Sequence, residues 1–201
     1  MKKHRRHIIA IVVTALISVT LYAARTNSDR LSLLQPLLEY NHPFSPDAPV
    51  DSIIAWEKLL EPELQKEQQY PLLFQINLLT VQALITEGIS LAINQANQMY
   101  QKAREMDYPL GIALALHAIG NTYLSSSTPQ VAIKSYKEAL EIIQKLPHAN
   151  QYIKTILSQF ILTKLNYHQM TDIEDNIREL ESVINKDTNP QDDFHLVYCQ
   201  A

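Results

Sequence analysis

Apolar residues recur at helical spacing along most of this chain, and residues 113–147 show the pattern most clearly. Two apolar faces, each with residues three or four positions apart, flank a polar Ser-Ser-Ser-Thr-Pro segment. Residues at this spacing share one face of a helix. The stretch therefore predicts two helices joined by a turn, which is a helical hairpin. The two faces consist of Leu116, Ile119, Gly120 and Tyr123, and then of Ala132, Tyr136 and Ala139.

Small and aromatic residues are combined on these faces in a way that favours close helix packing. Gly120, Ala132 and Ala139 let two backbones approach closely, because their side chains take up little space. Tyr123 and Tyr136 are large enough to fill the space between neighbouring hairpins. We therefore assign these positions to packing between helices.

The pattern extends to both sides of the central hairpin. Alignment of the turns pairs Ala92 with Ala132 at a period of 40 residues, and the following hairpin lies 41 residues on. A register of 36 residues buries the same face, since it differs by about one helical turn. Pro62 is expected to kink or end its helix. The predicted segments are a degenerate hairpin at 29–70, repeats at about 71–110, 111–148 and 149–188, and the start of another repeat at 191–201.

The central hairpin resembles the tetratricopeptide repeat. The resemblance implies an all-α fold, a right-handed α-solenoid of antiparallel helical hairpins whose first helices line a concave groove. In that family the groove usually binds a peptide or a partner protein. The family's closing proline is displaced here, with Pro147 three residues late. Leu116 stands at the family's usual Trp, Ile119 and Gly120 at its Leu-Gly pair, Tyr123 at its Tyr, Ala132 at its Ala and Tyr136 at its Phe.

Four polar residues are candidates for the face that would line such a groove. His117 and Asn121 are one helical turn apart, and Asn77 and Ser158 stand at the places equivalent to His117 in the neighbouring repeats. Asn121 resembles the Asn that binds peptide backbone in clamp-type members of the family, although the Lys and Arg of that clamp are missing. The alternative is that all four are ordinary exposed polar residues.

Residues 1–28 differ from the rest of the chain. Basic residues precede an uncharged run from Ile8 to Ala24, which as a helix would extend roughly 25 Å and nearly span a bilayer. Because basic residues before such a run stay in the cytoplasm, we predict that residues 8–24 anchor the chain in a bacterial inner membrane by a single pass. The C-terminal part would then lie in the periplasm. A signal peptide that is cleaved to release the chain into the periplasm is the alternative.

Charge and chemistry narrow the possible functions. Residues 31–201 carry 11 Lys and Arg against 20 Asp and Glu, a net charge of about −9 that makes nucleic acid an unsuitable partner. We find no catalytic, phosphate-binding or metal-binding motif, so we expect no enzyme activity and no cofactor. The single Cys199 cannot form an internal disulfide. Four acidic residues are expected on a solvated helix face: Glu57, Glu61, Glu63 and Glu67.

The whole layout also resembles the extracytoplasmic sensing region of bacterial membrane-anchored signalling proteins, such as histidine kinases. The last predicted helix ends with apolar residues uncovered, and a solenoid needs a polar cap. We therefore expect the chain to be truncated. The resemblance implies a protein-binding module that senses a ligand for a signal-transduction protein. A self-contained periplasmic scaffold is the alternative.

Overall fold

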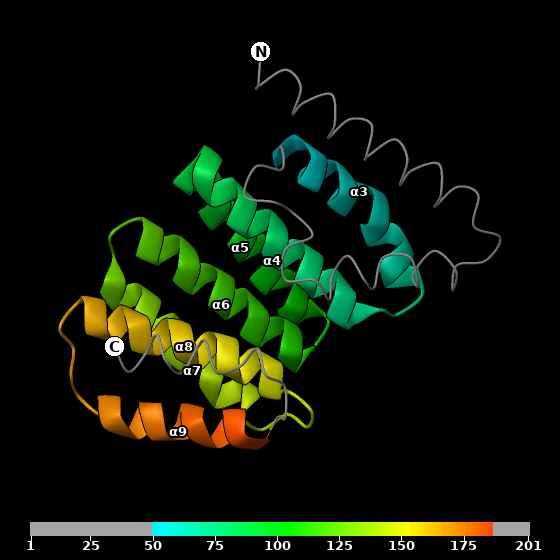
Figure 1. The fold of residues 1–201 in the computed structure, drawn as a ribbon. Helices are drawn as coiled ribbons and strands as arrows, with labels where there is room; N and C mark the ends of the chain where they lie inside the picture. The colour runs from blue at the N-terminus through cyan, green and yellow to red at the C-terminus, as the bar shows by residue number, and fades with distance from the viewer. Residues whose placement is uncertain (1–49, 187–201) are drawn as a thin grey trace, which may run out of the picture. The chain divides into compact units, whose positions relative to one another are not determined.

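The computed structural model describes residues 50–186, and this part of the chain is all-helical (Figure 1). The all-α prediction is therefore confirmed for these residues. The predicted membrane segment at 8–24, the first half of the hairpin predicted at 29–70 and the repeat start at 191–201 lie outside them. The helices are α3 (Val50–Lys66), α4 (Tyr70–Glu87), α5 (Ile89–Glu105), α6 (Pro109–Ser125), α7 (Pro129–Ile143), α8 (Asn150–Asn166) and α9 (Ile173–Lys186).

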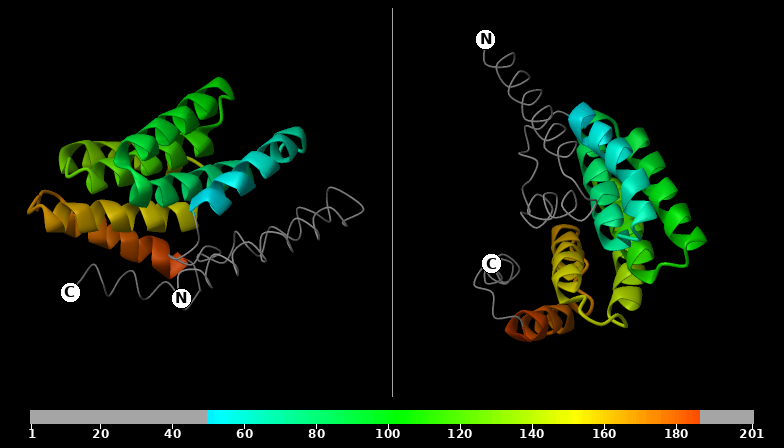
Figure 2. Two further views of the ribbon diagram at one scale, coloured as in Figure 1. Left: turned by 90° about the horizontal axis from the view of Figure 1, so that it is seen from above. Right: turned by 90° about the vertical axis from the view of Figure 1, so that its right-hand side faces the viewer.

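The chain divides into two compact units, Met1–Glu87 and Gly88–Ala201. In the described part of the first unit, α3 packs against α4, and α3 continues through Pro62 to its end. In the second unit each helix from α5 to α9 packs against its neighbours in the chain, and α8 and α9 run antiparallel (Figures 1 and 2). The boundary between the units falls inside the range 71–110 that was predicted as one repeat.

Four of the helices end in the same backbone motif, a pair of hydrogen bonds around one left-handed residue. After α6, the N–H of Ser127 donates to the carbonyl of Leu124 (3.1 Å), and the N–H of Thr128 donates to the carbonyl of Tyr123 (2.9 Å). Ser127 has φ of 60°, so it occupies the left-handed region that this closing motif requires. The next helix begins two residues later, and the chain reverses direction within a short turn. The left-handed residues of the four motifs are Gln68, Asp107, Ser127 and His168.

The helices recur at a nearly constant interval. The residues that precede α5 and α7, Gly88 and Thr128, are 40 positions apart, which is the period that alignment of the turns predicted. The first residues of α6 and α8 are Pro109 and Asn150, which lie 41 positions apart. Equivalent faces of successive helices can therefore be compared position by position.

Contact between Gly120 and Tyr136 brings α6 and α7 together. Tyr136 is fully buried, as are Ala132 and Ala139 on the same face of α7. A Cβ atom placed on Gly120 would lie 2.3 Å from Cε1 of the Tyr136 ring and 2.9 Å from its Cζ, far inside contact distance. Only glycine fits at this position while the ring stays in place. The repeat-packing residues on α6 are Leu116 and Gly120, which are buried, and Ile119 and Tyr123, which are half-buried.

We predict that Gly120→Ala lowers the free energy of unfolding by about 2 kcal/mol, because the added methyl group collides with a ring that the core holds fixed. In a Tyr136→Leu background the collision is removed, and the same substitution should instead stabilise the chain by about 0.5–1 kcal/mol through the better helix propensity of alanine. Urea unfolding of the four proteins measures this reversal of sign. A destabilisation of equal size in both backgrounds would show that the ring does not set the requirement for glycine.

Candidate functional site

The structure places the four predicted groove residues on three helices, with Asn77 on α4, His117 and Asn121 on α6, and Ser158 on α8. Asn77, His117 and Ser158 each have only 3% of their surface exposed, and Asn121 is half-buried. Only His117 and Asn121 have a described contact with each other. Asn77, His117 and Ser158 are therefore not the exposed polar residues of the alternative interpretation, and their side chains are also not accessible for groove binding in this structure.

His117, Asn121 and Tyr136 form a polar cluster between α6 and α7. The Tyr136 hydroxyl donates to Oδ1 of Asn121 (2.7 Å), and Nδ2 of Asn121 lies 3.4 Å from Nε2 of His117. The rings of His117 and Tyr136 are tilted at 51° with their centroids 5.9 Å apart. The Tyr136 hydroxyl therefore connects α6 and α7.

The hydrogen-bond directions fix the protonation state of His117. Since Oδ1 of Asn121 accepts from Tyr136, its amide nitrogen must point toward Nε2 of His117. An amide nitrogen only donates, so Nε2 must accept, and the ring proton sits on Nδ1. Burial lowers the pKa of His117 from 6.5 to about 4, which keeps the ring neutral near pH 7. Burial also raises the pKa of the Tyr136 hydroxyl.

A second buried polar pair lies between α3 and α4. Nδ2 of Asn77 donates to Oε1 of Glu57 (2.5 Å), and both residues are buried. The prediction that Glu57 belongs to a solvated face is therefore wrong, while Glu61, Glu63 and Glu67 are half-buried. The acidic pattern along α3 gave no sign that one carboxylate turns inward to meet an amide 20 residues further on.

Two buried polar atoms at equivalent repeat positions lack a hydrogen-bond partner within residues 50–186. They are Oδ1 of Asn77 and Oγ of Ser158. A buried polar atom without a partner costs about 1–3 kcal/mol. Asn77 lies in the first unit and Ser158 in the second, and each stands at a position that the resemblance assigned to partner binding.

Lys164 was missed by the sequence analysis. Its ammonium group donates to the carbonyl of Thr171 and to Oδ1 of Asn176 (3.2 Å), and lies 5.0 Å from the centre of the Phe160 ring. Lys164 thereby links α8 to the α8–α9 connection and to α9. A lysine within an otherwise apolar helix face was the available signal, because such a residue needs polar partners when it is buried.

Within residues 50–186 no three side chains of His, Cys, Asp or Glu come together as metal ligands. None of the helices described there is both long and apolar enough to cross a membrane. Comparison of the chain with protein-family models, with curated proteins and with solved structures found no match.

We predict that His117 makes stability depend on pH. The unfolded state takes up a proton near pH 6.5, whereas the folded state resists it until about pH 4. The contribution of a neutral His117 to the free energy of unfolding is therefore fully present above pH 6.5. It decreases as the pH falls toward 4, by about 3 kcal/mol in total.

Urea unfolding of the wild type and of His117→Gln at several pH values between 7 and 4 tests this prediction. Within the described residues the ring is in contact with Asn121 and Tyr136, neither of which titrates in that range. The difference in unfolding free energy between the two proteins should shrink by up to about 1.4 kcal/mol per pH unit as the pH falls. Parallel pH profiles would refute the assignment.

Proposed function

We propose that this chain is a membrane-anchored interaction module built from tetratricopeptide-like hairpins, which form a right-handed α-solenoid. The observation that carries the proposal is the recurrence of one helical unit at 40–41 residues together with the Gly120–Tyr136 contact. A small residue on a first helix facing an aromatic residue on a second helix is the arrangement that the repeat resemblance implies. Arrays of this kind bind partners along extended surfaces.

Two buried polar atoms, one in each compact unit, support binding of a peptide or protein partner. Asn77 and Ser158 each hold a polar atom without a described partner, at positions equivalent to His117. A peptide backbone offers N–H and C=O groups that can satisfy such atoms. Since these residues are buried, partner binding would involve a rearrangement of the packing around them. Uncompensated polar atoms that lower stability are retained most readily where function requires them.

We predict that Ser158→Ala stabilises the partner-free chain by about 1 kcal/mol, because it removes a buried hydroxyl that has no hydrogen-bond partner among the described residues. Ser135→Ala is the matched control, since Ser135 is also a buried helical serine and its hydroxyl oxygen is not among the fully buried atoms that lack a partner. The gain for Ser158→Ala should exceed that of the control. In cells, chemical cross-linking should capture less of the partner with Ser158→Ala than with the control. Equal capture by both variants would remove Ser158 from the binding site.

We further propose that the chain is the sensing part of a signal-transduction protein, with residues 8–24 as the anchor and the helical part in the periplasm. This follows from the order of basic leader, apolar run and acidic helical region in the sequence. A periplasmic scaffold that assembles other proteins is the second candidate, and it fits the alternative in which the leader is cleaved.

We predict that an alkaline phosphatase fused after residue 201 is active in a bacterial host, since that enzyme folds only outside the cytoplasm. The fusion should sediment with membranes and resist extraction by alkaline carbonate, as an integral membrane protein does. Recovery of an active fusion in the soluble periplasmic fraction would favour the cleaved scaffold. An inactive fusion would contradict both proposed locations.

A further inference from the structure

The exposed face of α5 contains no charged residue from Ile89 to Gln101. Amide side chains occupy this face at intervals of three and four residues, opposite the buried Ala92, Ala96 and Met99. Leu91 is also exposed, with 57% of its surface accessible. We refer to this face as the α5 amide face. It consists of Leu91, Asn94, Asn97, Gln98 and Gln101.

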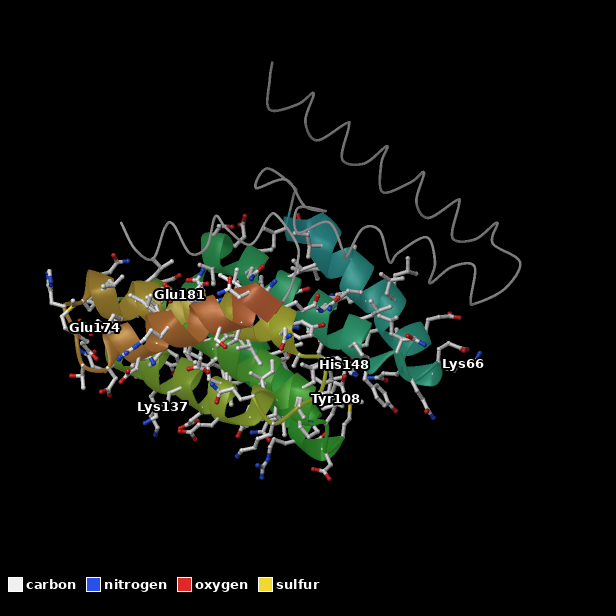
Figure 3. The ribbon with its side chains drawn as sticks, turned by 60° about the horizontal axis from the view of Figure 1, so that its bottom comes forward. Lys66, Tyr108, Lys137, His148, Glu174 and Glu181 are labelled. Carbon is white, nitrogen blue, oxygen red and sulfur yellow. The ribbon has the colours of Figure 1, made fainter. Side chains whose placement is uncertain are left out.

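The equivalent face of α7 shows what the fold itself requires at these positions. At the period of 40 residues, every amide of the α5 amide face corresponds to an exposed charged residue on α7. Lys137 projects away from the ribbon there (Figure 3), and Lys134 pairs with Glu138 at 3.8 Å. Charged residues are therefore fully compatible with this position in the repeat. The α7 residues that correspond to Asn94, Asn97, Gln98 and Gln101 are Lys134, Lys137, Glu138 and Glu141.

We propose that the α5 amide face binds the same face of a second copy of this chain, so that the protein forms a two-fold symmetric dimer. In such a dimer each surface must complement itself. At the two-fold axis a carboxylate or ammonium group would meet its own charge, whereas an amide can pair with its own copy because it carries both a donor and an acceptor. The chain has a net charge of −4, so an uncharged face is where two copies approach with the least repulsion.

The position of the amides also suits an antiparallel arrangement of the two α5 helices. The midpoint of α5 lies at Asn97, so a two-fold axis near Asn97 and Gln98 lets the helices overlap along their full length. This places Asn94 opposite Gln101 of the second copy. Leu91 then lies opposite Arg104, whose aliphatic stem can cover an apolar side chain while its charged group stays in water.

Sedimentation and light scattering of the full-length chain in mild detergent test the dimer over about 1–100 µM, the range expected for an interface near the small end of specific contacts. The substitution Asn97→Glu with Gln98→Glu should raise the dissociation constant at least about tenfold, because like charges meet at the axis. The pair Asn97→Lys with Gln98→Lys should do the same. A one-to-one mixture of the two variants should regain association as a heterodimer, which a misfolded variant could not do.

Lys137→Glu is the matched control on α7. It changes the net charge by the same amount as the acidic α5 variant, and it leaves two adjacent carboxylates at the equivalent exposed positions. This control should dimerise like the wild type. The proposal is overturned if the wild type is monomeric over the whole range, if the acidic α5 variant still dimerises, or if the control loses the dimer equally. It is also overturned if the mixed variants do not associate. None of these outcomes depends on whether Ser158 binds a partner.

Discussion

The close contact between Gly120 and the Tyr136 ring is the constraint on which the second unit depends. It lets α6 and α7 approach until the ring lies against bare backbone, and this approach places the Tyr136 hydroxyl next to Asn121. A tyrosine at this position thus supplies both the bulk that fills the space between helices and a polar group that fixes their mutual orientation. A phenylalanine would supply only the first.

Satisfied and unsatisfied polar groups play different parts in this structure. His117, Asn121 and Tyr136 exchange hydrogen bonds, so their burial costs little as long as His117 stays neutral. Lys164 is likewise buried with oxygen atoms around its ammonium group. Ser158 has no such compensation within the part of the chain that the structure describes. Buried polar groups normally have hydrogen-bond partners. The Ser158 hydroxyl is therefore a better candidate for a functional role than the hydrogen-bonded cluster around His117.

The sequence predicted the helices and their spacing because both depend on local signals. Apolar periodicity, prolines at helix starts and polar turns located α6 and α7 closely, and alignment of the turns gave the 40-residue period. Burial of individual polar residues was not predictable in the same way. Whether Glu57 or His117 turns inward depends on which side chain approaches from another helix. Periodicity shows which face a residue occupies, but it does not show what covers that face.

Equivalent positions in a repeated structure separate the demands of folding from those of function. Four positions are buried in both α5 and α7, because neighbouring helices cover them and restrict them to uncharged residues. Ala92 corresponds to Ala132, but the residues at the other three positions differ in size. Exposed positions have no such restriction, and α7 shows that charged residues are accepted there. The fold therefore gives no reason for the run of amides on α5. The contrast with α7 is therefore the observation from which we infer that the α5 amide face binds a second copy of the chain.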